Sequence, residues 1–431
     1  MIEKKVAFYT LGCKVNQYET NAMQSDFEKA GYKIVDFSEI SDVYIINTCT
    51  VTGMSDKKSR QIIRRAKQLN PNSIVCAVGC YAQVSKEEIE KIKEVDIILG
   101  TIEKKDILKI VEEKLKNNSD KQFIFVDNIM KLQNYKEYNE TAFSEHIRAE
   151  IKVQDGCDRF CSYCIIPYAR GPVRSRNPEA IIKEIKTLVK SGIKEIVITG
   201  IHVSSYGKDF KDKDYRLIDL LEDINKIDGL NRIRLSSLEP RIIDVDFVSR
   251  LIKLEKICNH FHLSLQSGCD DTLKRMNRKY TTDEFKNIVK LLRDNYKDVA
   301  LTTDVIVGFP GETEEEFNIT LNFLKEINFS KMHIFKYSKR KGTPAATMPN
   351  QVDEIIKDER SKKLIELSTK NEREFASRYL NNEIEVLFEN SKEGHTTNYI
   401  KVCLENEENE YTNKIVKVVP QKIGKENELI I

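Results

Sequence analysis

The sequence lacks any hydrophobic run that approaches the roughly 20 apolar residues needed to span a membrane. It also lacks an excess of charge of either sign, because 70 lysines and arginines stand against 68 aspartates and glutamates, for a net charge of +2. Binding to a nucleic acid would therefore depend on local basic patches. No secretory signal is visible, since a charged start passes directly into a strand pattern. We expect a soluble, cytoplasmic protein that does not bind membranes.

The length and the cysteine count narrow the class further. At roughly 150 residues per domain, 431 residues predict about three domains. A hydrophobic content of 40% leaves room for a core even though 32% of the residues are charged. Without an export signal, the ten cysteines are expected to be metal ligands, catalytic thiols or core residues, and disulfides are the least expected use.

Three cysteines fall within one short segment, Cys157, Cys161 and Cys164, in the pattern C-x3-C-x2-C. Thiolates on one such loop can hold three corners of an iron–sulfur cube. Since a cube normally takes four cysteines, one iron would stay open for a non-protein ligand. The alternative is a zinc site, but zinc prefers four closed ligands and C-x2-C pairs, and the nearest upstream histidine, His146, is eleven residues away. The spacing therefore favours an iron–sulfur cluster.

A second set of cysteines, Cys13, Cys49 and Cys80, stands at the ends of predicted strands. Each follows a short apolar run, and helical patterns separate the runs, which indicates a parallel α/β sheet. The carboxyl ends of parallel strands meet at one edge, where ligands bind, so we expect these cysteines to meet in space. The alternative is that they are ordinary buried cysteines. We assign only the remaining four to the core: Cys76, Cys258, Cys269 and Cys403.

The alternation of strand and helix patterns predicts an α/β protein. Residues 1–115 predict a parallel α/β domain, and residues 116–142 a linker with one short strand. Residues 143–371 contain six βα units, which predict a partial (βα)6 barrel with its active site at the carboxyl ends of the strands. Residues 372–431 predict a small β-barrel. We find no internal repeat and no low-complexity tract.

Polar residues and glycines follow the predicted barrel strands at their carboxyl ends. Each segment alone is as consistent with a turn as with a ligand site, but together they favour a cofactor cradle. A further candidate is the aromatic residue directly before the third cysteine of the C-x3-C-x2-C segment. The residues assigned to the cradle are Tyr163, Gly200, Glu239, Gln266, Ser267 and Gly308.

Two basic segments are candidates for contact with a nucleic acid. A helix predicted over residues 55–70 carries basic residues at spacings of 3, 4 and 3, which places them on one face. Residues 159–176 add four arginines and no acid. Phosphate contacts from these segments would steer an RNA to the site, although a solvated helix surface is an equal alternative for the first. The last 60 residues hold 12 acids against 8 basic residues, so they cannot bind RNA by net charge. The predicted RNA contacts are Lys57, Arg60, Arg64, Lys67, Arg170 and Arg174.

The C-x3-C-x2-C segment resembles the radical S-adenosylmethionine (SAM) superfamily, and nearly the whole chain resembles the methylthiotransferases within it. The resemblance implies a radical SAM core with a 4Fe–4S cluster on Cys157, Cys161 and Cys164. It implies a second, auxiliary 4Fe–4S cluster on the three strand-end cysteines of the amino-terminal domain, and a TRAM-like carboxy-terminal β-barrel. It also implies that SAM serves both as methyl donor and as radical source, with the chemistry supplied by the cofactors.

Four motifs resemble the branch that modifies N6-threonylcarbamoyladenosine next to the tRNA anticodon. This resemblance implies methylthiolation at C2 of that base in the anticodon arm, with an electron donor such as a flavodoxin or ferredoxin. Two alternatives stay open: methylthiolation of a ribosomal protein side chain, and a non-catalytic iron–sulfur sensor that binds RNA. The motifs are Leu11-Gly12-Cys13-Lys14-Val15-Asn16-Gln17-Tyr18-Glu19-Thr20, Asn47-Thr48-Cys49-Thr50-Val51-Thr52, Lys58-Ser59-Arg60-Gln61 and Cys164-Ile165-Ile166-Pro167-Tyr168-Ala169-Arg170-Gly171.

Overall fold

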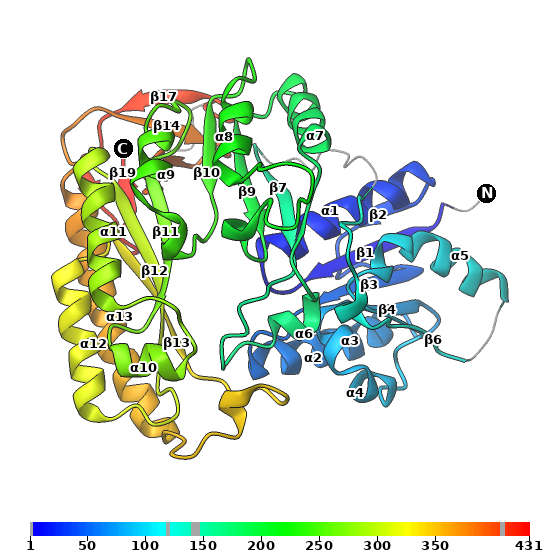
Figure 1. Cartoon of the computed structure of the whole chain (residues 1–431). Coiled ribbons are helices and arrows are strands. Elements are labelled where there is room, and N and C mark those ends of the chain that lie inside the picture. Colours follow the sequence, from blue (N-terminus) through cyan, green and yellow to red (C-terminus); the bar gives the residue numbers. More distant parts are fainter. Residues whose placement is uncertain (1–2, 118–120, 139–146, 406–409) are drawn as a thin grey trace.

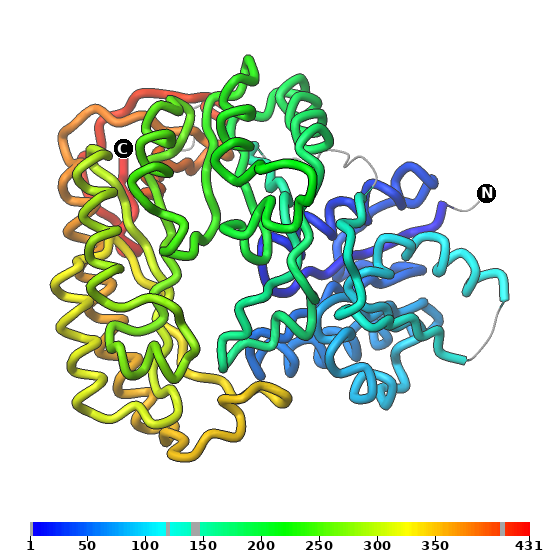
Figure 2. Tube along the Cα trace, in the orientation of Figure 1, coloured from blue at the N-terminus to red at the C-terminus, as the bar shows by residue number. Residues whose placement is uncertain are grey.

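The computed structural model describes residues 3–117, 121–138, 147–405 and 410–431 (Figure 1). Three bodies follow one another along the chain: a parallel sheet with helices, a partial barrel of strands and helices, and a small β-sheet domain. In the tube of Figure 2, the green part of the chain lies between the blue amino-terminal part and the red carboxy-terminal part. Within the described chain, no helix is both long enough and apolar enough to cross a membrane.

The amino-terminal sheet is parallel throughout, as the sequence predicts, with the strand order β2-β1-β3-β4-β5-β6. Its central strands are apolar because helices cover both faces. Ile62 and Ile63 pack on one face, and Phe27 and Ile110 on the other. The strands are β1 (Lys5–Thr10), β2 (Lys33–Val35), β3 (Val43–Thr48), β4 (Ile74–Gly79), β5 (Ile97–Leu99) and β6 (Phe123–Phe125). The helices are α1 (Lys14–Lys29), α2 (Gly53–Leu69), α3 (Cys80–Val84), α4 (Lys86–Glu90) and α5 (Ile107–Asn117).

The barrel contains the six parallel strands that the sequence predicts, arranged in two sheets. The orders are β10-β9-β7-β8 and β11-β12-β13, and isolated bridges such as Leu238–Leu263 connect them. The strands are β7 (Arg148–Asp155), β9 (Glu195–Gly200), β10 (Arg232–Leu235), β11 (His260–Gln266), β12 (Ala300–Val307) and β13 (Lys331–Lys336), with the short antiparallel β8 (Arg174–Ser175) added. The helices are α6 (Ile166–Arg170), α7 (Pro178–Lys190), α8 (Leu217–Asn225), α9 (Val245–Leu251), α10 (Asp270–Arg275), α11 (Thr282–Asn295), α12 (Glu314–Ile327) and α13 (Glu354–Ser377).

The carboxy-terminal domain is a sheet of six strands that covers the amino ends of the barrel strands. Arg232 at the start of β10 donates to the His395 carbonyl at 3.0 Å, and Arg148 at the start of β7 lies 2.9 Å from Glu389. The end of the barrel that carries the C-x3-C-x2-C segment is therefore the opposite one. The strands are β14 (Ile384–Phe388), β15 (Glu393–Thr396), β16 (Lys401–Cys403), β17 (Ile415–Val418), β18 (Lys422–Ile423) and β19 (Leu429–Ile430).

The expected domain boundaries agree only in part with the observed elements. The linker expected over residues 116–142 supplies β6, which extends the amino-terminal sheet next to β5. The boundary at 142 lies outside the described residues. The boundary at 371 falls inside α13, because this helix packs Leu364 on the barrel core and Phe375 on the core of the carboxy-terminal sheet. The likeness of that last domain to a TRAM domain stays a prediction.

Candidate active site

The C-x3-C-x2-C loop follows β7 directly, at the carboxyl end of the barrel. Gly156 begins the turn with a φ of +74°, which favours glycine. A Cβ atom on it would lie 1.8 Å from the Pro172 carbonyl oxygen, so no other residue fits. The Cys157 amide donates to the Gly171 carbonyl at 2.9 Å. These contacts fix the start of the loop against the segment that returns from it.

The thiols of this loop influence one another. Burial, together with the neighbouring Cys161, raises the pKa of Cys157 to about 11 and that of Cys164 to about 12. Arg278 donates to the Cys161 sulfur at 3.4 Å. Among the described residues, no three His, Cys, Asp or Glu side chains converge closely enough to bind one metal ion. A cube offers a separate iron to each thiolate, so this spacing fits a cluster better than a single zinc.

Four of the six residues predicted to hold SAM lie in this loop or at the carboxyl ends of the barrel strands. The Tyr163 ring packs edge to face on Phe309, two residues after β12, with 6.5 Å between the ring centroids. The Glu239 carboxylate accepts a bond of 2.9 Å from Arg159 of the loop. The other two residues, which end β9 and β11, are Gly200 and Gln266. Their positions agree with a cradle at this edge, and their contacts with SAM stay a prediction.

The remaining two candidates, Ser267 and Gly308, already form hydrogen bonds within the chain. The Ser267 hydroxyl lies 3.2 Å from that of Thr320 on α12. The Gly308 amide donates to the Glu312 carboxylate. Both residues therefore stabilise the turns that follow their strands, and a direct role in SAM binding also stays a prediction.

His202, two residues beyond the end of β9, is a candidate that sequence reasoning missed, although the neighbouring Gly200 was assigned to the cradle. Its Nδ1 lies 2.7 Å from the Ser205 hydroxyl, whereas Nε2 is buried with no partner among the described residues. Burial, together with Arg159 and Arg278, lowers the pKa of His202 to about 3, so the ring is neutral. The Ser236 hydroxyl after β10 is also buried without a described partner. Buried polar groups rarely stay unpaired, so this edge fits a polar cofactor such as SAM.

Cys13, Cys49 and Cys80 lie together at the carboxyl edge of the amino-terminal sheet. A Cβ atom on Gly12 would lie 2.8 Å from the Cys49 sulfur. Burial, together with the nearby Cys80 and Cys13, raises the pKa of Cys49 to about 11. Cys76, in contrast, lies inside β4 within an apolar cluster of the sheet. The structure thus brings the three cysteines together, and their role as cluster ligands stays a prediction.

A buried ionic network connects the two sets of cysteines. Glu19 on α1 accepts hydrogen bonds from Arg170 at 2.6 and 3.0 Å, from Lys152 at 2.6 Å and from Lys104. Lys152 also donates to Asp155 at 2.6 Å, and Asp155 accepts the first amide of the C-x3-C-x2-C loop at 2.8 Å. Burial alone would raise the pKa of Glu19, but Arg170, Lys104 and Lys152 hold it well below its usual range. The carboxylate is therefore ionised.

This network corrects the prediction that Arg170 and Arg174 contact RNA phosphates. Arg170 is 0% exposed and donates to the Cys80 sulfur at 3.2 Å and to Asn16 at 2.6 Å. Arg174 is 3% exposed and donates to the carbonyls of Arg170 and Pro172 at 2.9 and 2.8 Å. Side chains buried in this way cannot reach a phosphate. The sequence misses their burial because the partner of Arg170, Glu19, lies 151 positions away.

The network contains more cations than anions. Among the residues that the structure describes, two carboxylates, Glu19 and Asp155, face four cationic side chains, which gives an excess of two positive charges. An uncompensated buried charge costs several kcal/mol, so the site is suited to a further anion. A 4Fe–4S cube on three thiolates is anionic, and Cys80 contacts the network. The residues therefore fit an auxiliary cluster. The four cations are Lys104, Lys152, Arg170 and Arg174.

Only part of the predicted basic face of α2 is exposed and able to contact a phosphate. Lys57 and Arg64 are exposed. Arg60 donates to the Tyr81 hydroxyl at 2.6 Å, and Lys67 pairs with a neighbouring carboxylate at 2.9 Å. The structure therefore leaves Lys57 and Arg64 as the members of this face that are open to a phosphate.

A contact that the sequence did not suggest fastens α2 to the barrel. Arg340, in the loop after β13, forms an ion pair with Asp56 and donates to the Thr50 hydroxyl at 2.8 Å. The Gly53 amide donates to Ser338 of the same loop at 3.1 Å. Asp56 is the single acid between residues 51 and 70, so this pair occupies the carboxylate that would oppose the basic face.

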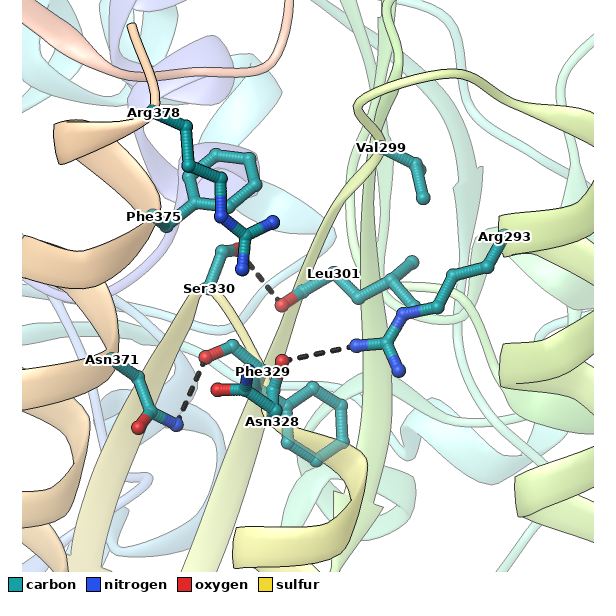
Figure 3. Close-up of a pocket in the computed structure, with 9 residues that line it drawn as sticks. All are labelled: Arg293, Val299, Leu301, Asn328, Phe329, Ser330, Asn371, Phe375 and Arg378. Atoms are coloured by element: carbon teal, nitrogen blue, oxygen red, sulfur yellow. Dashed lines mark hydrogen bonds between the residues drawn. The ribbon is translucent and has the colours of Figure 1, made fainter. Parts of the chain in front are cut away.

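The cavity in Figure 3 lies away from both sets of cysteines. It has a volume of about 270 Å³ and lies between α11, α13 and the starts of β12 and β13. Arg293 donates to the Asn328 carbonyl at 3.0 Å, and Asn371 donates to the Phe329 carbonyl at 3.2 Å. None of the residues predicted for the site is among those described as lining it. These bonds tie α11 and α13 to the sheet.

Two protein families match separate segments of the chain, and each segment contains one set of cysteines. Residues 5–100, which contain Cys13, Cys49 and Cys80, match the Uncharacterized protein family UPF0004. Residues 151–324, which contain the C-x3-C-x2-C loop, match the Radical SAM superfamily. The fold is similar to that of a radical S-adenosylmethionine methyltransferase, TsrM, from Kitasatospora setae, with a TM-score of 0.58 and 14% identity over 80% of this chain and 74% of that one.

Relatives cover nearly the full length of the chain. It is 48% identical to the threonylcarbamoyladenosine tRNA methylthiotransferase MtaB of Bacillus subtilis, over 91% of this chain and 89% of that one. The Aquifex aeolicus protein of the same name shares 43% identity over 92% and 95%. A tRNA-2-methylthio-N(6)-dimethylallyladenosine synthase of Thermoanaerobacter shares 39% over 88% and 81%. The fold, the paired cysteine sets and this extent of identity agree, and the chain belongs to the family of radical SAM methylthiotransferases.

Proposed function

We propose that the protein transfers a methylthio group to C2 of N6-threonylcarbamoyladenosine in tRNA. The observation that carries the proposal is the pair of cysteine sets held at two strand edges and joined by one buried cationic network. The substrate follows from the relatives, because the Bacillus subtilis and Aquifex aeolicus proteins named for threonylcarbamoyladenosine share 48% and 43% identity. The Thermotoga maritima protein of that name and the Thermoanaerobacter synthase named for dimethylallyladenosine each share 39%.

The residues divide between the two cofactor sites. Cys157, Cys161 and Cys164 would hold a 4Fe–4S cluster with one iron open to SAM, and the three strand-end cysteines of the amino-terminal domain would hold the auxiliary cluster. When bound, the clusters and SAM supply the one-electron chemistry, the sulfur and the methyl group that exchange a hydrogen on an aromatic carbon for methylthio. SAM would lie against the polar strand ends, where His202 offers a neutral ring nitrogen.

The protein's own contribution is position and exclusion of water. The Glu19 network fixes α1 of the amino-terminal domain against β7 of the barrel, so both cluster loops keep one separation. Figure 1 shows α6, which ends at Arg170, beside α3, which begins at Cys80. Fixed separation and a dry interior favour two steps on one substrate atom. The adenine would have to leave its stack to reach this interior.

The proposed partners are a tRNA anticodon arm and a one-electron donor such as a flavodoxin or ferredoxin. Lys57 and Arg64 on α2 are suited to phosphates of the arm. Of the two alternatives, methylthiolation of a ribosomal protein finds no support in the names of the relatives described above. A sensor without catalysis would not need the unpartnered polar atoms at the barrel edge.

The proposal is tested with anaerobically reconstituted protein, SAM, a reductant and two tRNAs. One tRNA carries threonylcarbamoyladenosine and the other dimethylallyladenosine at the same position. Mass spectrometry of the digested nucleosides should show the methylthio product only for the first tRNA. Product from the dimethylallyl tRNA alone would move the protein to the other branch. Product from neither, with 5′-deoxyadenosine formed in both, would contradict a tRNA substrate.

A further inference from the structure

Each nitrogen of the buried Arg170 guanidinium donates a hydrogen bond, and these bonds fix the side chain in the interior. Nη1 and Nη2 donate to Glu19 at 2.6 and 3.0 Å, and Nη2 also donates to Asn16 at 2.6 Å. Nε is left for the Cys80 sulfur, at 3.2 Å. The planar fork of arginine permits this arrangement, because a carboxylate on one edge fixes the direction of the remaining N–H. Arg170 therefore points one fixed donor at the sulfur.

The position of this donor has a consequence for a cluster bound at Cys80. Hydrogen bonds to the sulfurs and the local net charge are among the factors that set the reduction potential of an iron–sulfur cluster. Reduction adds one electron and no proton to an anionic cluster, so a nearby cation stabilises the reduced form more than the oxidised form. Arg170 supplies both the hydrogen bond and part of the positive excess, and burial excludes the water that would screen them.

We propose that Arg170 is a positioning residue for the auxiliary cluster: the Arg170 side chain orients Cys80 and raises the reduction potential of the cluster. The proposal rests on the proposed role of Cys13, Cys49 and Cys80 as ligands. It gives Arg170 a role in the interior in place of the RNA contact predicted from the sequence. The C-x3-C-x2-C loop has a parallel arrangement, since Arg278 donates to the Cys161 sulfur at 3.4 Å.

The structure offers a matched control in Arg174. It belongs to the same network, lies 3.6 Å from Asp155, and is almost fully buried. Its described hydrogen bonds go to the carbonyls of Arg170 and Pro172. Arg174→Gln therefore removes one positive charge from the network without removing a donor to sulfur. Arg170→Gln removes both the positive charge and the donor to sulfur. Arg170→Lys keeps the charge, but a single ammonium group cannot replace the hydrogen bond to Cys80 together with the bidentate contact to Glu19.

The experiment uses the full-length chain with the three cysteines of the C-x3-C-x2-C loop replaced by alanine, so that only the auxiliary cluster forms. After anaerobic reconstitution, the cluster is titrated with dithionite as the electron source. The reduction potential and the electron paramagnetic resonance spectrum of the reduced cluster are recorded for the three variants. We expect Arg170→Gln to shift the potential to more negative values, Arg170→Lys to shift it less, and Arg174→Gln to shift it least.

The outcomes separate this inference from the function on which it rests. If the background chain binds no iron, the auxiliary cluster is refuted and the role of Arg170 falls with it. If Arg170→Gln keeps its full iron and the parent potential, or if Arg174→Gln shifts the potential equally, the role of Arg170 alone is refuted. If Arg170→Gln cannot hold a cluster, Arg170→Lys decides: a potential more negative than that of Arg174→Gln supports the proposal, and the parent value refutes it.

Discussion

Replacing Glu19 by glutamine tests the buried network, because it removes the carboxylate that three cations share. Glu19 is fully buried and lies 2.6 Å from both Arg170 and Lys152. Removing one partner of a buried ion pair costs about 3–5 kcal/mol, since the remaining charge stays desolvated without compensation. Three cations contact this one carboxylate, so we expect the upper part of that range, about 4–5 kcal/mol.

The assay is a urea titration of the metal-free protein followed by far-ultraviolet circular dichroism, since the sequence has no tryptophan for fluorescence. Glu39→Gln is the matched control. Glu39 forms an ion pair with Lys5 at 3.8 Å, and both side chains are about half exposed. Such surface pairs contribute about 0–1 kcal/mol. We expect Glu19→Gln to lower the midpoint of unfolding strongly, and Glu39→Gln to leave it nearly unchanged.

The pH dependence adds an independent check. The pKa of Glu19 is held well below its ordinary value of 4.5. A depressed pKa in the folded state contributes stability that is complete above the unfolded value and is lost as the pH falls through the folded value. The difference between parent and Glu19→Gln should therefore be constant near neutrality and shrink below about pH 4.5. A difference no larger than that of Glu39→Gln, or one that grows on acidification, would refute the network as described.

Three further predictions concern the clusters and the RNA. Replacing all three cysteines of the C-x3-C-x2-C loop by alanine should reduce about eight irons per chain to about four and abolish 5′-deoxyadenosine formation; continued formation would contradict the assignment. Cys80→Ala should lose the auxiliary iron and the methylthio product but keep SAM cleavage, whereas Cys76→Ala should keep both clusters at about 1 kcal/mol of packing cost; equal iron loss would overturn this distinction. Changing Lys57 and Arg64 to glutamine should lower the slope of log affinity against log salt for tRNA by about 0.7–0.9 per lost phosphate contact. SAM cleavage without tRNA should be unaffected, and Lys290→Gln, which alters a lysine paired with Asp294 on α11, should leave the slope at the parent value.

The strand plan could be predicted because the buried strands are short apolar runs with glycine or polar residues at their ends. Val43–Thr48 and Ile74–Gly79 are buried along their whole length, and each precedes a cysteine at the edge of the sheet. The carboxyl ends of parallel strands lie at one edge of the sheet, so the position of each cysteine after an apolar run was sufficient to predict that the three cysteines meet. The same reasoning placed the C-x3-C-x2-C loop at the end of β7.

The side-chain environment of the basic residues could not be predicted in this way. Arg64 and Arg170 look alike in the sequence, yet one is exposed and the other is completely buried. What separates them is an acid from a distant element, since Glu19 reaches Arg170 only after α1 has packed on β7. Ser267 is a similar case, because its hydroxyl is taken by Thr320 of a helix that the local sequence does not reveal.

The buried network also explains why the two sets of cysteines belong to one folded unit rather than to separable domains. Glu19 and Lys104 come from the amino-terminal sheet domain, whereas Lys152 and Arg170 come from the barrel. Separating the domains would expose Glu19 with a single lysine on one side and leave Lys152, Arg170 and Arg174 with Asp155 as their one described carboxylate on the other. Each half would then lose both stability and the fixed distance between the cysteine sets. The contact between the domains is therefore part of the proposed active site, and Arg170 contacts both Glu19 of the network and Cys80 of the proposed auxiliary cluster.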